Sequence, residues 1–162
     1  MLLESSKIKM ECLESFKGKN PFGDKRLLKD LKSLLKIFEK EFKFKGISQL
    51  EMSLTLCGKK RIQSLNRIHR KKDKTTDVLS FPVHDLYLKK KLLGYIGLGD
   101  IFICLDVAQS QAKEFNISVR EEIIHLFVHG FLHLLGYDHE ISKKEEKKMF
   151  ALERKLISGL KD

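Results

Sequence analysis

Residues 125–140 read HLFVHGFLHLLGYDHE, and this stretch contains four of the six histidines of the chain. The four are His125, His129, His133 and His139. The apolar residues between them indicate a helix that Gly136 ends. His129 and His133 are four residues apart, so their rings project from one face of this helix, about 6 Å apart. The turn after Gly136 can bring His139 back toward the pair. Three imidazoles can then hold one metal ion and leave a fourth position open for water.

The sequence around the histidine pair restricts the chemistry further. His125 lies on the same face but about 12 Å along the helix axis from His133, too far to bind one ion together with it. We therefore expect His125 to be an outer contact of the site or a core residue. A zincin protease carries glutamate directly after the first histidine as its general base, and Gly130 takes that place here. Peptide hydrolysis is disfavoured.

Hydrophobic periodicity predicts an α+β fold with a small mixed β-sheet, helices packed mainly on one side of it, and a zincin-like metal-binding helix. The expected helices are residues 24–42, 59–70, 106–115, 118–135 and 142–160. The expected strands are residues 52–56, 77–83 and 93–104, the last being one strand or a pair joined near 97–100. Asp24 is placed to cap the first helix, and Ser118 with Glu121 and Ser142 with Glu145 form capping-box patterns. The order of the strands stays open.

Length and composition limit the class of protein. The 162 residues predict a single domain, 1–162, and no stretch is long and apolar enough to cross a membrane. Three widely spaced cysteines argue against a disulfide framework and a thiolate zinc site, and the first residues lack a secretion signal, so we expect a cytoplasmic protein. A net charge of +10 suggests a polyanionic partner such as nucleic acid, although many lysines only solvate a surface.

Three blocks of sequence resemble the YbeY family of endoribonucleases, the rRNA maturation factors. Residues 129–139 match the family signature HGxLHLxGYDH. Asn66, Arg70 and the TDVLSFP of residues 76–82 match a second block, and the GDI of residues 99–101 matches a third. The resemblance covers roughly residues 47–157. The chain departs from the usual family pattern in a few places: His69, Thr75, Lys143 and Lys144.

The resemblance implies a set of site residues. It implies one zinc ion per chain, held by His129, His133 and His139, with Arg70 and His129 as catalytic residues. The guanidinium of Arg70 can meet a phosphate with a planar fork and neutralise developing charge. The basic loop that follows is expected to bind substrate together with Arg70, through Lys72 and Lys74. Asp138 is expected to hydrogen-bond a ligand imidazole. Asp77, Ser80 and Asp100 are expected to cap turns or orient ligands, and no residue stands out as a general base.

The resemblance also implies the activity: zinc-dependent, single-strand-specific cleavage of RNA phosphodiester bonds in rRNA maturation, at the 3′ end of 16S rRNA, and in ribosome quality control. The implied partners are single-stranded rRNA precursor and the small ribosomal subunit with its assembly factors, with no membrane and no DNA. Two alternatives stay open. One is a metal-dependent hydrolase of a non-RNA substrate, and the other is a non-catalytic, basic, RNA-binding assembly factor whose zinc is structural.

Overall fold

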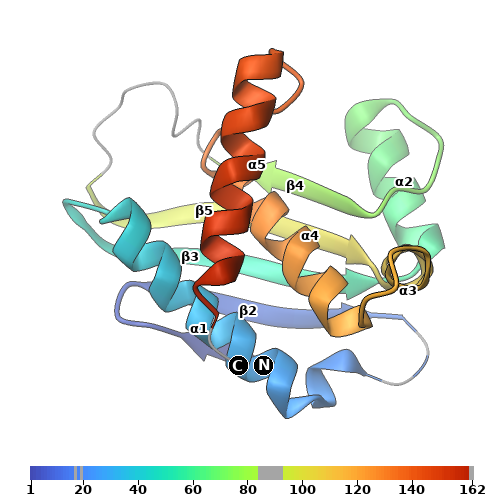
Figure 1. The fold of residues 1–162 in the computed structure, drawn as a ribbon, viewed down its shortest axis with the longest axis horizontal. Helices are drawn as coiled ribbons and strands as arrows, with labels where there is room; N and C mark the ends of the chain where they lie inside the picture. Colours follow the sequence, from blue (N-terminus) through green and yellow to red (C-terminus); the bar gives the residue numbers. More distant parts are fainter. Residues whose placement is uncertain (17, 19, 84–92, 161–162) are drawn as a thin grey trace.

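A five-stranded mixed sheet forms the centre of the molecule (Figure 1). The structure, a computed structural model, describes residues 1–16, 18, 20–83 and 93–160. The strands are β1 (Leu2–Glu4), β2 (Ile8–Ser15), β3 (Ile47–Cys57), β4 (Val78–Pro82) and β5 (Gly94–Cys104). They lie in the order β1-β2-β3-β5-β4, with β2, β3 and β5 parallel and both edge strands antiparallel to their neighbours. The predicted mixed sheet is confirmed.

Three of the helices cover one face of this sheet, as predicted. The α-helices are α1 (Lys25–Phe42), α2 (Lys59–Arg70), α3 (Leu105–Glu114), α4 (Val119–Leu134) and α5 (Lys143–Ser158), and a 3-10 turn, Pro21–Gly23, precedes α1. The main core lies between the sheet and α1, α4 and α5, where Phe38 of α1 stacks on Phe131 of α4 with ring centroids 3.8 Å apart. Helix α2 covers part of the opposite face through a smaller cluster around Ile62 and Leu79. None of the described helices is long and apolar enough to span a membrane.

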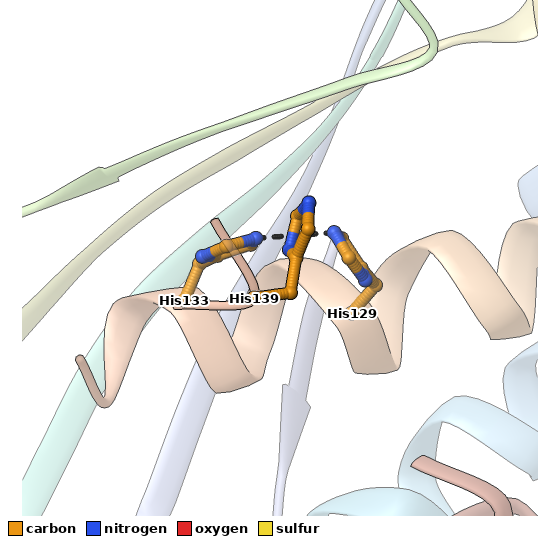
Figure 2. Close-up of side chains that lie close together, drawn as sticks. All are labelled: His129, His133 and His139. Carbon is orange, nitrogen blue, oxygen red and sulfur yellow. Dashed lines mark hydrogen bonds between the residues drawn. The ribbon is translucent and has the colours of Figure 1, made fainter. Parts of the chain in front are cut away.

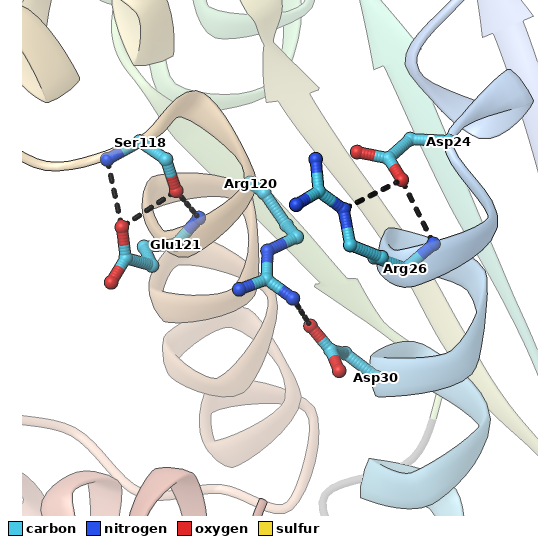
Figure 3. Close-up of polar contacts among 6 residues, drawn as sticks. All are labelled: Asp24, Arg26, Asp30, Ser118, Arg120 and Glu121. Atoms are coloured by element: carbon cyan, nitrogen blue, oxygen red, sulfur yellow. Dashed lines mark hydrogen bonds and ion pairs between the residues drawn. The ribbon is translucent and has the colours of Figure 1, made fainter. Parts of the chain in front are cut away.

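Helix α4 is held at its N-terminus and along its length, which fixes the position of its histidines. Ser118 and Glu121 form the predicted capping box, and Arg120 pairs with Asp30 of α1 at 2.9 Å (Figure 3). Further along, a Cβ at Gly130 would lie 2.9 Å from a side-chain carbon of β5 and 3.0 Å from the Ser80 hydroxyl. Only glycine allows the helix to come this close to the sheet.

The structure corrects several sequence-based boundaries. Strands β1 and β2 were not predicted, and β3 extends over Ile47–Cys57 instead of residues 52–56. Residues 93–104 form the single strand β5, and each predicted helix ends within two residues of the observed one. At α5 the Ser142 hydroxyl accepts from the Glu145 backbone as expected. Glu145 itself pairs with Lys148, so the reciprocal half of the predicted capping box is not formed.

Candidate active site

Three imidazoles converge at the C-terminal half of α4, as the sequence predicts. His129 and His133 project from the same face of the helix, and His139 reaches over them from the loop that follows (Figure 2). One ring nitrogen of each histidine lies within 4.8 Å of those of the other two. The chain can turn back here because Gly136 has φ +92°, a left-handed conformation that glycine adopts without strain.

A buried carboxylate orients the first of these histidines. Nδ1 of His129 lies 2.6 Å from Oε1 of Glu153, which projects from the buried side of α5. Burial acts to raise the pKa of Glu153, but the facing His125 and His129 side chains lower it to about 2, so the carboxylate is ionised at neutral pH. Because an ionised carboxylate only accepts, Nδ1 of His129 carries the proton and Nε2 presents its lone pair to the other two histidines.

The donor set fits a metal ion such as zinc. Nε2 of His129 and Nε2 of His133 are 3.1 Å apart. Two nitrogens bound to tetrahedral zinc at 2.0–2.1 Å would be separated by about 3.3 Å. Burial and the neighbouring His129 and His139 lower the pKa of His133 to about 4, so it is neutral and able to ligate at pH 7. Nδ1 of His139 is buried and has no hydrogen-bond partner among the described residues. Coordination of a metal ion by its lone pair would satisfy such an atom.

The histidines line an open pocket of about 340 Å³. Arg70, at the C-terminal end of α2, lines the same pocket, as do Asp77, Glu140 and Phe150. The carboxylate of Asp77 accepts hydrogen bonds from the Val78 backbone at 2.7 Å and from Gln111 at 3.1 Å, so it fastens the start of β4 to α3. The fold therefore brings Arg70 to the three histidines although at least 59 residues separate them in sequence.

His125 lines the same pocket, on one side of the three histidines. It is 48% exposed and lies between two buried carboxylates, 3.7 Å from Glu122 and 3.8 Å from Glu153. It is not a member of the three-histidine group. Glu153 in turn contacts His129, so His125, Glu153 and His129 form a chain of polar side chains with His125 at its outer end.

Other predicted residues lie around the pocket or away from it. Oδ1 of Asp138 accepts from the Glu140 backbone at 2.8 Å, and the carboxylate that holds an imidazole of the triad is Glu153 instead. Lys72 and Lys74 are exposed on the loop after α2 and do not line the pocket. The Asn66 amide donates to the Lys74 carbonyl at 2.8 Å, which fixes this loop.

Ser80 in the second family block and Asp100 in the third connect elements of the fold, whereas the sequence led us to expect turn caps or ligand contacts. Ser80 donates to the Gly130 carbonyl at 3.1 Å and so ties β4 to α4. Asp100 accepts from the Ser53 hydroxyl in a separate hollow on the open face of the sheet, away from the histidines. Both side chains hold elements together.

Glu153 and Phe150 are two site residues that sequence reasoning missed. A signal for Glu153 was present: it lies between Met149 and Leu156 at helical spacing, so a carboxylate occupies a core position of α5. A buried charge needs a partner, and this requirement points toward the histidines. Phe150 adjoins the buried Met149 and has no comparable signal.

Comparison with known proteins agrees with this geometry. The family model described as "Endoribonuclease YbeY" matches residues 14–161. The chain belongs to the YbeY family. It is 42% identical over 139 residues to the Endoribonuclease YbeY of Persephonella marina, covering 86% of this chain and 88% of that protein. It is 45% identical over 115 residues to that of Aquifex aeolicus, covering 71% and 73% of the two chains.

The fold is also similar to a solved structure. The solution structure of TM1509 from Thermotoga maritima matches with a TM-score of 0.57 at 29% identity, over 93% of this chain and 87% of that one. The family match confirms the resemblance that residues 66–82, 99–101 and 129–139 suggested, and it begins further toward the N-terminus, within β2. The similarity to YbeY proteins therefore includes α1, for which the sequence offered no family motif.

Proposed function

We propose that the protein is a zinc-dependent endoribonuclease that hydrolyses phosphodiester bonds of single-stranded RNA. The observation that carries this proposal is the pocket that joins three convergent imidazoles to the Arg70 guanidinium, in a chain of the YbeY family. The imidazoles suit a metal ion, and the guanidinium suits a phosphate.

His129, His133 and His139 hold the ion, one per chain. A zinc ion in such a site supplies Lewis-acid polarisation of a phosphoryl oxygen and a lowered pKa for water. Glu153 keeps His129 in the tautomer that presents Nε2, and the buried environment keeps His133 neutral. The three ligands leave one side of the site open to the pocket, which suits a catalytic site better than a closed structural one.

Arg70 binds the scissile phosphate and stabilises the charge that builds up on it. It lies at the end of α2, and the loop that follows, with Lys72 and Lys74, extends the positive charge outward from the pocket. Phosphate contacts of this kind position a strand without reading its bases. Arg70 is the only lysine or arginine among the described residues that line the pocket, so we expect phosphate binding inside the pocket to depend on it.

The biological setting follows from the family. We propose that the single domain of residues 1–162 acts in the cytoplasm on rRNA precursor, at the 3′ end of 16S rRNA, and in ribosome quality control. Its partners are the small ribosomal subunit and its assembly factors. The net charge of +10 supports association with ribosomal RNA.

Cleavage of a labelled single-stranded RNA tests the proposal. The zinc-loaded protein should cleave it, and a chelator should stop cleavage until zinc is restored. Arg70→Ala should keep fold and zinc content and reduce cleavage by roughly 10²-fold or more, and Arg70→Lys should recover part of the loss. Arg67→Ala is the matched control, because Arg67 is exposed on the same helix turn but does not line the pocket. Full activity with chelator present would contradict the proposal, and so would equal losses in the two arginine variants.

A further inference from the structure

One flank of α5 carries an aromatic ring between cations. Lys143, Lys147, Phe150 and Arg154 follow one another at intervals of four, three and four residues, so they form a single stripe along the helix. All four are exposed, whereas Met149, Glu153 and Leu156 on the adjacent side are buried. In Figure 1 the N-terminal turns of α5 extend past β4, the edge strand of the sheet. We call these four residues the α5 flank.

Phe150 connects the α5 flank to the metal pocket. It lines the same pocket as Arg70 and the three histidines. Its ring lies nearly parallel to that of His139, at 25° and with centroids 6.2 Å apart, and the residue is 37% exposed. Contact between an exposed phenylalanine ring and water is unfavourable in free energy. A base stacked on the ring would remove this contact.

The cations of the α5 flank are available to a polyanion. Lys143, Lys147 and Arg154 form no ion pair with any part of the chain that the structure describes. On the other side of the helix, Lys155 pairs with Glu41 at 2.7 Å. From the first to the last residue the flank spans about 16 Å, room for several successive phosphates of one strand.

We propose that the α5 flank is a binding track for single-stranded RNA that leads out of the metal pocket. Phe150 stacks on a base next to the scissile phosphate, and the three cations contact phosphates along the strand. This inference rests on the proposed function, because it assumes that RNA is the substrate. It also gives a physical reason for preferring single strands, since a base in a duplex is already stacked and paired and has no free face for Phe150.

Single-turnover cleavage of labelled oligo(rA) by the zinc-loaded protein, titrated over protein concentration, tests the track. Phe150→Leu should raise the half-saturating concentration roughly tenfold, and Phe150→Trp should restore binding. The double variant Lys147→Gln with Arg154→Gln should bind RNA more weakly. The slope of its log affinity against log salt concentration should be less steep by about 1.4, because two phosphate contacts are lost and each contributes about 0.7 on a single strand. Inorganic polyphosphate, which has charge but no bases, should compete equally well against wild type and Phe150→Leu, and less well against the double cation variant.

The controls separate the possible failures. Phe115→Leu removes an exposed aromatic ring at the end of α3, and Lys32→Gln with Lys36→Gln removes two exposed charges from α1; both should behave as wild type. Zinc content is measured in every variant, because a loss of zinc in Phe150→Leu with unchanged half-saturation would make the residue structural and overturn the track. Unchanged half-saturation in the flank variants, or equal weakening in the controls, would also overturn it while leaving the proposed function intact. Absence of cleavage by wild type would remove the proposed function and the track with it.

Discussion

Replacing Glu153 by glutamine tests how the protein orients the proposed metal ligand His129. Oε1 of Glu153 lies 2.6 Å from Nδ1 of His129, and the side chain is almost fully buried on α5. Glutamine keeps the size and can still accept this hydrogen bond, but it removes the charge that makes His129 a better donor to the metal. Loss of such an outer partner typically costs 10–100-fold in metal affinity. We expect Glu153→Gln to lose zinc affinity by about tenfold. Glu153→Leu should lose about 100-fold.

Competition for zinc against a chromophoric chelator at pH 7 measures the effect. Glu122→Gln is the matched control, since Glu122 is equally buried and pairs with His125 at 3.7 Å, and among the described residues it has no hydrogen bond or ion pair with the histidine triad. It should retain wild-type zinc affinity. Wild-type zinc affinity in Glu153→Gln, or an equal loss of affinity in both variants, would refute the proposed role of Glu153. Unchanged affinity in Glu153→Gln would mean that packing alone orients His129. Equal losses would mean that removal of either buried carboxylate charge, at Glu153 or at Glu122, disturbs α4.

Three further predictions concern the histidines of α4, the close approach at Gly130 and the buried contacts of Glu39. His133→Ala should lose most of the zinc measured by elemental analysis, whereas His125→Ala should keep it, and loss of zinc from His125→Ala would place His125 among the metal ligands. Gly130→Ala should lower the free energy of unfolding by about 1–3 kcal/mol, because its Cβ would lie 2.9 Å from β5, while Gly97→Ala, with nothing within 4 Å, provides the comparison in a thermal melt. Burial acts to raise the pKa of Glu39, but hydrogen bonds from residues 5–8 lower it below its ordinary value. The unfolded chain therefore binds that proton more readily, and stability should fall as the pH drops below about 5. Glu39→Gln should reduce this dependence in urea titrations, and an unchanged pH profile would contradict the assignment.

Local spacing explains which parts of the fold could be predicted. The histidines of α4 follow a strict helical period, and Gly136 marks the reversal that returns His139, so the triad is visible in one segment of sequence. Strands β1 and β2 were missed although Ile8, Met10 and Cys12 alternate with exposed residues, because short alternation near a terminus shows no partner in the sequence. The pairing of β2 with β3, with Ile8 opposite Leu50, depends on contacts across more than 40 residues. Such contacts leave little local trace.

The residues of the site also divide into those visible in local sequence spacing and those that depend on distant contacts. Arg70 was assigned to it by family resemblance, and no periodicity could have shown that the end of α2 reaches the pocket. Asp138 was expected to hydrogen-bond an imidazole because it adjoins His139 in sequence, but the tight turn directs its carboxylate to the Glu140 backbone. Proximity along the chain is thus a poor guide to outer contacts of a metal site. Burial of a charged residue at a helical core position is a better one.

Helix α5 joins the two halves of the proposed chemistry in one rigid element. Met149 and Leu156 anchor it in the main core, and between them Glu153 holds His129 while Phe150 faces the mouth of the pocket. Glu153 and Phe150 are three residues apart, so they lie on adjacent sides of the same turn and cannot move independently. Any shift of α5 that moves the proposed RNA flank therefore also changes the hydrogen bond on His129. A site built this way binds its substrate and orients its metal ligands through the same packing contacts, which restricts the substitutions that the core side of α5 can accept.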